Sequence, residues 1–183
     1  MVPPKAPILR GFSFVIMGTW KVVYIASRQE KKVSRTLTQL GIVHYLPLVK
    51  KLQQWSDRKK WVEIPLFNGY LFVRPLEKEL EKVLQVQGIV SYLKFSKKMA
   101  LVSDKEIDII RQIEKSGYHT EQNFEEADFQ LGQKVEINSG PLKGQKGILL
   151  QKKGHKIFVI LFESFKQSIK INLPISIINK VVE

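Results

Sequence analysis

The chain has 183 residues, of which 44% are hydrophobic, enough to supply cores for two small domains. It contains no cysteine, which excludes disulfides, thiolate nucleophiles and cysteine-ligated metal sites and fits a reducing cytoplasm. The net charge of +13 is uneven: residues 1–60 carry 12 basic and 2 acidic side chains, 61–128 carry 9 and 12, and 129–183 carry 9 and 3. This clustering favours a polyanionic partner, the alternative being a basic balance that only provides solubility.

Residues 1–18 are interpreted as an N-terminal extension. Their apolar run, Phe12–Met17, is far shorter than the roughly 20 residues that a membrane span requires, so no membrane association is expected. No small-residue cleavage site follows it, which argues against a signal peptide. Because the domain-like pattern begins only near Thr19, we expect Met17 to be the natural start of the protein.

Residues 19–116 predict one α+β domain. The run Trp20–Ala26 is rich in β-branched and aromatic residues and predicts a strand. From 29 to 40 the hydrophobic period becomes helical, with Val33, Leu37 and Leu40 on one face. The expected elements that follow are a strand at 43–52, a basic hairpin tip at 50–60, a returning strand at 61–66, a central strand at 70–73, a helix at 77–86, a strand at 89–95 and a helix that an S-x-x-E capping box starts at 103–106 and that ends near 115.

A polar stripe on the first helix is a candidate nucleic-acid surface. Its members are spaced by four, three and four residues and therefore stack on one face: Arg28, Lys32, Arg35 and Gln39. Taken alone, the stripe is more simply the solvated face of an amphipathic helix. Other parts of the sequence have to decide between the two interpretations.

Residues 117–128 predict a solvated linker, and residues 129–183 predict a second domain. The linker segment carries four acidic residues and no hydrophobic periodicity. After it, β-rich stretches recur between turn signals at 134–137, 147–150, 156–162, 167–173 and 177–182. Five short strands in so few residues predict a small closed barrel, because closure removes the sheet edges.

The sequence contains no recognisable catalytic, cofactor or metal pattern. His44, His119 and His155 lie in separate elements without H-x-x-H or H-E-x-x-H spacing. The glycine-rich stretch 140–147 lacks the Ser or Thr of a phosphate-binding loop and precedes a strand, where such a loop needs a helix. We therefore expect a binding protein without a cofactor, and an enzyme of a new kind is the least favoured reading.

The order of elements and motifs resembles the NusG family of transcription factors, over residues 19–183. In the N-terminal part the resemblance is carried by Trp20, Tyr24, Glu30, Val33, Leu46-Pro47, the run P-L-F-N-G-Y-L-F-V at 65–73, Gly88-Ile89-Val90 and the capped helix after Ser103. In the C-terminal part, residues 131–135 and 137–148 resemble the KOW motif, with glycines at Gly140, Gly144 and Gly147. Both matches in this order are more specific than either alone.

The resemblance implies a four-stranded antiparallel N-terminal sheet with flanking helices, and a five-stranded SH3-like KOW barrel. It also implies that an apolar pocket grips the clamp helices of the RNA polymerase β′ subunit, and that the first helix faces the non-template DNA strand. The implied polymerase-binding residues are Tyr24, Tyr70, Phe72, Ile89 and Phe95, although strand aromatics are more often core. The implied nucleic-acid-binding residues are Arg28, Lys32, Arg35, Gln39, Lys50, Lys51, Trp55, Arg58, Lys59 and Lys60.

Three features depart from the family pattern. Asn68-Gly69 replaces the usual Pro-Gly or Pro-Asn before the tyrosine. Leu80-Glu81-Lys82 stands without the His-Thr-Thr that resembles the gate-loop contact of the antiterminator RfaH. The run Ile157–Phe162 is β-branched and aromatic, which predicts a permanently β-structured domain without a helical alternative.

The resemblance implies a monomeric, cytoplasmic elongation or antitermination factor that holds polymerase in its elongating conformation. The hairpin at 55–58 followed by Pro65-Leu66-Phe67 looks more like the specialised, operon-specific RfaH-like antiterminators, including those of capsular polysaccharide operons, than like general NusG. A ribosomal protein or a termination factor is the implied partner class of the KOW domain. The alternative is a ribosome- or RNA-binding KOW module, which leaves the aromatic N-terminal domain without a purpose.

Overall fold

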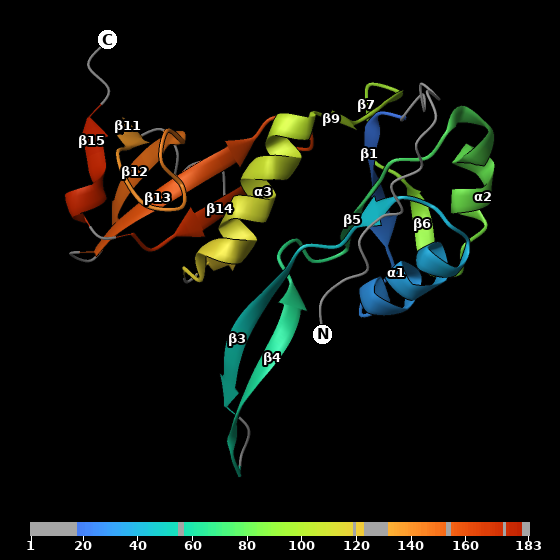
Figure 1. Ribbon diagram of the computed structural model, residues 1–183, viewed down its shortest axis with the longest axis horizontal. Coiled ribbons are helices and arrows are strands. Elements are labelled where there is room, and N and C mark those ends of the chain that lie inside the picture. Colours follow the sequence, from blue (N-terminus) through green and yellow to red (C-terminus); the bar gives the residue numbers. More distant parts are fainter. Residues whose placement is uncertain are drawn as a thin grey trace, which may run out of the picture.

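The computed structural model describes residues 18–54, 57–118, 120–122, 132–152, 155–173 and 175–180. The expected N-terminal extension, apart from Gly18, lies outside the described residues, and so do Trp55 and His119. Figure 1 shows an N-terminal α/β part, a long hairpin that projects from it, a central helix and a C-terminal β part. Helix α3 lies between the two larger parts.

The N-terminal sheet is antiparallel and has five strands. Four of them follow the order β2 (His44–Tyr45), β5 (Tyr70–Val73), β1 (Trp20–Ile25) and β6 (Ile89–Tyr92), while β9 (Leu101–Val102) also pairs with β1. The expected central strand is therefore confirmed, since β5 lies between β2 and β1. The expected count of four strands was wrong, because a two-residue strand such as β9 is too short to leave a periodic signal.

The two faces of this sheet pack against different elements. Side chains such as Val23 and Leu71 face α1 (Glu30–Gln39) and α2 (Leu80–Leu84), forming one apolar cluster. Trp20, Val22 and Phe72 point to the other face and belong to the cluster that includes α3. This division follows from the two-residue period of a strand.

Helix α1 buries Val33 and Leu37, as its periodicity predicts. Leu40 was expected on the same apolar face but is 37% exposed, because it is the C-cap residue and stands where the helix ends. The expected second helix is shorter than predicted: a 3₁₀ turn at Glu77–Glu79 precedes α2, which ends at Leu84.

Two hairpins interrupt the strands that the sequence predicted as continuous. The stretch expected at 43–52 divides at Leu46-Pro47 into β2 and β3 (Leu48–Gln54), and β3 pairs with β4 (Lys59–Pro65) to form the projecting arm. The strand expected at 89–95 divides into β6 and β7 (Lys94–Phe95), which pairs with β8 (Lys98–Met99). Proline at 47 cannot donate to a ladder, which accounts for the first break.

Helix α3 (Asp104–Ser116) begins at the expected capping box. The Glu106 backbone N–H donates to Ser103 Oγ at 3.2 Å, and the Ser103 N–H donates to Glu106 Oε2 at 2.9 Å. The helix ends at Gly117, which adopts a left-handed φ of 69°. Its buried face consists of Ile107, Ile110 and Ile113.

Replacing Ser103 by alanine is expected to cost about 1 kcal/mol of unfolding free energy, because the cap satisfies backbone N–H groups at the start of α3. Chemical denaturation of the full chain measures this loss. Ser103→Asp, which keeps a capping oxygen, should retain most of the stability. An unchanged unfolding free energy in Ser103→Ala would show that the cap contributes nothing.

The C-terminal sheet is antiparallel and has six strands in an open order. The order is β10 (Thr120–Gln122), β14 (Gln167–Ile171), β13 (His155–Phe162), β12 (Lys146–Lys152), β11 (Gln133–Ile137) and β15 (Ile178–Lys180). Five of these match the predicted strands. The sixth, β10, comes from the segment expected to be a solvated linker. Within the described residues β10 and β15 do not pair, so the expected closed five-stranded barrel is replaced by an open sheet.

Candidate interaction surfaces

An aromatic pair marks the edge of the N-terminal sheet face that turns away from α1 and α2. Tyr24 on β1 lies directly opposite Tyr70 on β5, and their rings make an edge-to-face contact with centroids 5.0 Å apart. Tyr24 is 44% exposed, and Tyr70 is half-buried. Burial, with a further contribution from neighbouring Tyr24, raises the pKa of the Tyr70 phenol, so the Tyr70 ring is uncharged at neutral pH.

The C-terminal sheet packs onto this face through a phenylalanine. Phe165, in the turn between β13 and β14, lies with its ring centroid 5.2 Å from that of Phe67 and 5.3 Å from that of Phe72. Phe162 adds a contact to Phe67 at 5.7 Å. One apolar cluster therefore runs through both parts of the molecule. Phe72 is completely buried as a result.

A polar contact accompanies this docking. Gln167 Nε2 donates to the Tyr70 hydroxyl at 3.4 Å, joining two residues that are 97 positions apart in the chain. Tyr70 therefore contacts the C-terminal sheet, whereas Tyr24 stays partly exposed to solvent. The sequence analysis left the relation between the two parts open, and this contact had no sequence signal.

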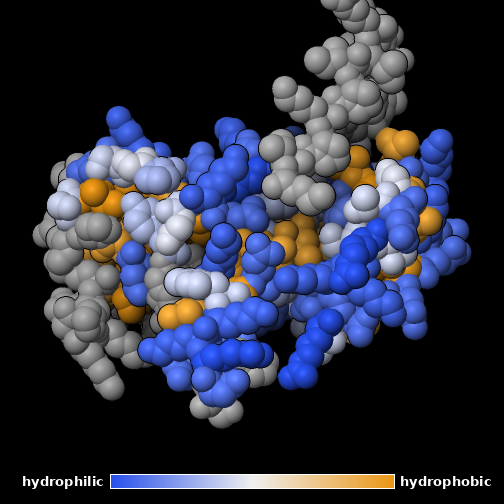
Figure 2. All heavy atoms as spheres, turned by 60° about the horizontal axis from the view of Figure 1, so that its bottom comes forward, coloured by the Kyte–Doolittle hydropathy of each residue, from blue (hydrophilic) through white to orange (hydrophobic). Residues whose placement is uncertain are grey.

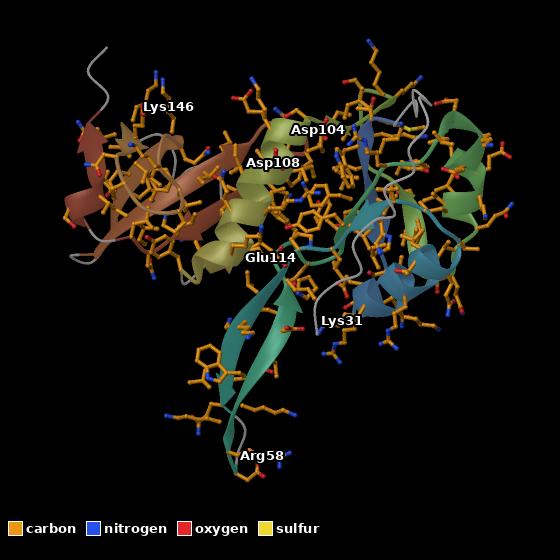
Figure 3. All side chains as sticks on the ribbon, in the orientation of Figure 1. Lys31, Arg58, Asp104, Asp108, Glu114 and Lys146 are labelled. Carbon is orange, nitrogen blue, oxygen red and sulfur yellow. The ribbon has the colours of Figure 1, made fainter. Side chains whose placement is uncertain are left out.

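The carboxylate of Glu114 ties α3 to the N-terminal part. It accepts from the Tyr45 hydroxyl at 2.7 Å and from the Leu48 backbone N–H at 3.1 Å. Burial, followed by the hydrogen bond to Glu114 and its negative charge, raises the pKa of Tyr45, whereas Arg111, stacked 5.4 Å from that ring, opposes the shift. Figure 3 shows Glu114 at the end of α3 that lies nearest the base of the hairpin. The helix and the hairpin base are therefore fixed to each other.

Not all of the residues expected to bind polymerase come together. Tyr24, Tyr70 and Phe72 share one face. Ile89 pairs with Ile25 and packs against the opposite face, with the cluster that contains α1 and α2. Phe95 lies on the β7–β8 hairpin and is exposed. Only Tyr24, Tyr70 and Phe72 therefore lie on one surface.

The expected nucleic-acid stripe is exposed on α1 and just before it. Arg35 and Gln39 face solvent, and Lys32 makes a long contact of 3.5 Å to the Gln87 side chain. Arg28 precedes the helix with a positive φ of 62°. The hairpin residues Lys50, Lys51, Arg58, Lys59 and Lys60 are exposed as well. Figure 2 shows largely hydrophilic residues on the side of the molecule that carries the hairpin and α1.

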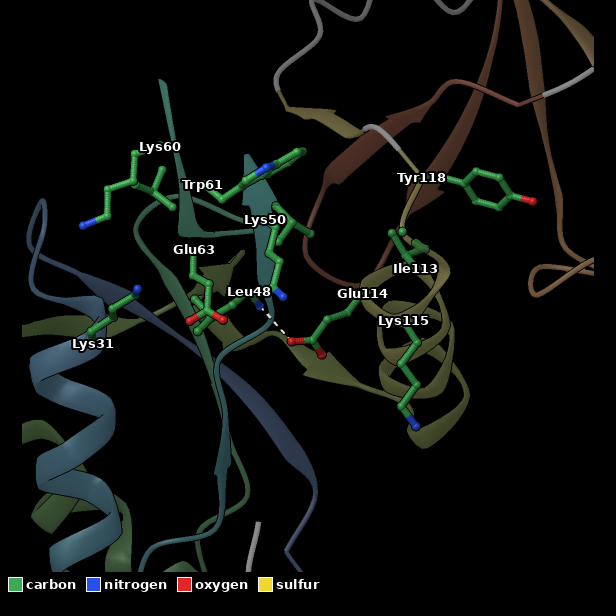
Figure 4. Close-up of a pocket in the computed structure, with 13 residues that line it drawn as sticks. Lys31, Leu48, Lys50, Lys60, Trp61, Glu63, Ile113, Glu114, Lys115 and Tyr118 are labelled. Carbon is green, nitrogen blue, oxygen red and sulfur yellow. Dashed lines mark hydrogen bonds between the residues drawn. The ribbon is translucent and has the colours of Figure 1, made fainter. Parts of the chain in front are cut away.

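A groove of about 1330 Å³ connects these two basic regions. Its walls come from the base of the hairpin, from Lys31 on α1 and from the end of α3 (Figure 4). Among its lining residues only Lys50 and Lys60 were predicted from the sequence to bind nucleic acid; Lys31, Trp61 and Lys115 are among those that were not. The exposure of Trp61 could have been predicted from Lys59 and Glu63, the charged residues two positions away on the same face of the strand.

Two of the three glycines of the expected KOW motif occupy left-handed backbone positions. Gly140 has a φ of 83° and Gly144 a φ of 82°, both in the loop between β11 and β12. Gly147 is required for a different reason. A Cβ at this position would lie 2.4 Å from the Val159 carbonyl oxygen and 2.6 Å from the Phe158 ring. The motif therefore shapes a turn and a tight strand contact.

Comparisons with known proteins add to this geometry. A family model described as "Transcription termination factor nusG" matches residues 18–111. The chain is similar to a solved structure, "Domain interaction in Thermotoga maritima NusG", at 20% identity over 90% of this chain and 97% of that chain, with a TM-score of 0.52. It also matches a chain of the structure "Crystal Structure of MjSpt4:Spt5 complex conformation A" at 14% identity over 90% of this chain and 99% of that chain, with a TM-score of only 0.29. No curated protein sequence matches the chain.

An α/β part with an aromatic face and basic surfaces, joined to a β-rich part, defines a protein that binds other macromolecules. None of the helices in the described ranges is long and apolar enough to cross a membrane. The matched segment spans just over half of the chain, from the start of the N-terminal sheet into α3. The chain belongs to the NusG family of transcription factors, as its motifs predicted.

Proposed function

We propose that this protein is a transcription elongation or antitermination factor, and that Tyr24, Tyr70 and Phe72 form its contact with the clamp helices of RNA polymerase. The observation that carries the proposal is the aromatic cluster on one face of the N-terminal sheet, with Tyr24 half-exposed at its edge. Aromatic rings give a groove for an amphipathic helix a large contact area, and tyrosine adds a hydrogen-bonding rim. Family membership supports polymerase as the partner.

The basic surfaces supply the second contact in this proposal. The exposed stripe on α1 and the cations of the hairpin hold the non-template DNA strand near the upstream edge of the transcription bubble. Lysine and arginine side chains on phosphates give affinity more readily than sequence choice. Binding polymerase and DNA together stabilises the elongating conformation, which lowers pausing and termination without any catalytic step.

Docking of the C-terminal sheet regulates the polymerase contact in this scheme. Phe72 is buried under Phe165, and Tyr70 is bonded to Gln167, so the proposed surface is only partly open. The β13–β14 turn has to leave before a clamp helix reaches Phe72. The affinity of the whole chain for polymerase then equals the affinity of the undocked form multiplied by the undocked fraction.

The finer assignments are part of the same proposal. The hairpin sequence supports an operon-specific factor of the RfaH-like type, acting as a monomer in the cytoplasm. The KOW motif supports a contact with a ribosomal protein or a termination factor. The competing proposal, a ribosome- or RNA-binding module, accounts for the basic C-terminal part and leaves the Tyr24–Tyr70 pair unused.

Tyr24→Ala and Tyr70→Ala are expected to weaken polymerase binding by about 10- to 100-fold each, as central interface aromatics do. The measurement is single-round transcription by bacterial RNA polymerase through a terminator, with the protein titrated. Intact protein should raise read-through, and the two variants should need correspondingly higher concentrations.

Leu161→Ala is the matched control, since Leu161 is an exposed apolar side chain on the C-terminal sheet. It should behave as the intact protein does. If the intact protein changes neither pausing nor termination on several templates and instead sediments with ribosomal subunits, the RNA-binding alternative replaces this proposal.

A further inference from the structure

The projecting hairpin carries an exposed apolar pair that neither the fold nor the proposed polymerase contact uses. Trp61 on β4 lies directly opposite Leu52 on β3, so both side chains stand on the same face of the ribbon. Trp61 is 64% exposed, and Leu52 is 45% exposed. A tryptophan at this exposure, beside a second exposed apolar side chain, forms a flat platform on an arm that reaches away from both cores (Figure 1).

Each of the two residue pairs that flank this platform along the ribbon contains a lysine. Two positions toward the base on the same face is the pair Lys50 and Glu63, and two positions toward the tip is the pair Gln54 and Lys59. One cation thus stands on each side of the indole, about 7 Å away along the strand direction. A chain molecule lying along the ribbon would meet Lys50 beside Glu63, then the aromatic face of Trp61, then Lys59.

The groove beside the platform has the same character. Lys31, Lys50, Lys60 and Lys115 line it together with Trp61. Of its two carboxylates, Glu114 already accepts hydrogen bonds from Tyr45 and Leu48. Figure 4 shows the Trp61 side chain standing out from its strand above Lys50 and Glu63. Cations therefore outnumber the acidic groups here, which fits an anionic occupant.

We infer that Trp61 is a stacking site for an unpaired base of single-stranded DNA, with Lys50 and Lys59 on the phosphates at either side. Stacking on an aromatic ring between cations is how single strands are bound without sequence choice, because every base has a π-face. This inference rests on the proposed function, in which the α1 stripe holds the exposed DNA strand. To the hairpin cations that hold the same strand in the proposed function, it adds Trp61 as a residue that stacks on one of the bases.

The test uses the full chain with Trp55→Phe, so that only two tryptophans remain. Trp20 is 4% exposed, donates its indole N–H to Asp104 at 2.9 Å and lies under Arg74, so it does not meet DNA. Quenching of fluorescence by oligothymidylate then reports on Trp61. The same oligonucleotide with its bases removed keeps the phosphates and should not quench.

Trp61→Ala in this background, followed by fluorescence anisotropy of dye-labelled oligothymidylate, is expected to weaken binding about 5- to 100-fold, and Trp61→Phe should retain most of the affinity. Because Trp61 is exposed, its replacement leaves the fold intact, and the Trp20 signal checks this. Lys78→Gln, an exposed lysine on the 3₁₀ turn before α2, is the charge control and should bind like the parent.

The result that overturns the inference is unchanged DNA affinity in Trp61→Ala, or equal quenching by the abasic strand. Tighter binding and stronger quenching by oligouridylate would assign the site to RNA and overturn it as well. If Trp61→Ala lost polymerase binding and kept its DNA binding, the Trp61–Leu52 pair would be a protein contact and the inference would be wrong. Failure of the proposed function gives a different result. In that case the double variant Lys32→Gln with Arg35→Gln would also leave DNA binding and read-through unchanged.

Discussion

Phe165→Ala is expected to release the C-terminal sheet from the N-terminal sheet and to strengthen polymerase binding by the full chain. The ring that it removes contacts Phe67 and Phe72 across the interface and Phe162 within its own sheet. Truncating a buried phenylalanine costs about 3–5 kcal/mol, through lost transfer energy and the cavity left behind. Most of this loss falls on docking, because two of the three ring contacts cross the interface.

The free energy that holds the C-terminal sheet against the N-terminal sheet is limited. The hydroxyl of Ser164, next to Phe165, is buried without a hydrogen-bond partner among the described residues. Such a group costs about 1–3 kcal/mol, which offsets part of what the aromatic contacts contribute. The loss in Phe165→Ala is therefore large enough to shift the equilibrium toward the undocked arrangement.

The absence of native cysteine makes the measurement direct. A donor and an acceptor dye on Lys78→Cys and Lys143→Cys, both exposed positions, report the separation of the two parts by energy transfer. The efficiency of energy transfer between the dyes should fall in Phe165→Ala and stay unchanged in Leu161→Ala. A double-mutant cycle with Phe67→Ala should give a coupling energy of about 0.5–3 kcal/mol. Unchanged transfer in Phe165→Ala would show that the ring does not hold the parts together.

Local elements were predictable because their signals are local. The capping box at Ser103 and Glu106 specifies the start of α3 whatever the rest of the chain does, and the strand Tyr70–Val73 follows from its apolar, β-forming residues. The short strands β9 and β10 were missed for the opposite reason. They exist because β1 and β14 offer them a free edge, and three residues or fewer carry no period of their own.

The candidate surface was predictable in part. Tyr24 and Tyr70 meet because β1 and β5 pair in a register that the motif implies, whereas Ile89 lies on the other face because of a register shift between Tyr24 and Ile25. A one-residue shift moves a side chain to the opposite face, and no sequence pattern announces it. The docking of Phe165 is equally hidden, since an aromatic residue that packs between domains has the same composition signal as one in a core.

Gly147→Ala is expected to destabilise the C-terminal sheet by about 1–3 kcal/mol or more, the cost of overpacking a close-packed site. The added methyl would lie 2.4 Å from the Val159 carbonyl oxygen. That oxygen belongs to the backbone of β13, next to β12, so it cannot move away without disturbing the pairing of these strands. Gly144→Ala is the matched control, because it has a left-handed φ of 82° and nothing near the new methyl. It should cost only about 1 kcal/mol, from backbone strain.

Chemical denaturation of the full chain distinguishes the two glycine variants. A loss of unfolding free energy in Gly144→Ala as large as in Gly147→Ala would contradict the steric argument.

The functional comparison for Gly147→Ala is with Phe165→Ala. Both Gly147→Ala and Phe165→Ala remove the cover from Phe72, one by loosening the sheet that carries Phe165 and the other by deleting the ring itself. Both should therefore bind polymerase more tightly, but only Gly147→Ala disturbs the pairing of β12 with β13 beside the expected KOW motif. An effect that needs a partner of the KOW domain should survive in Phe165→Ala and disappear in Gly147→Ala.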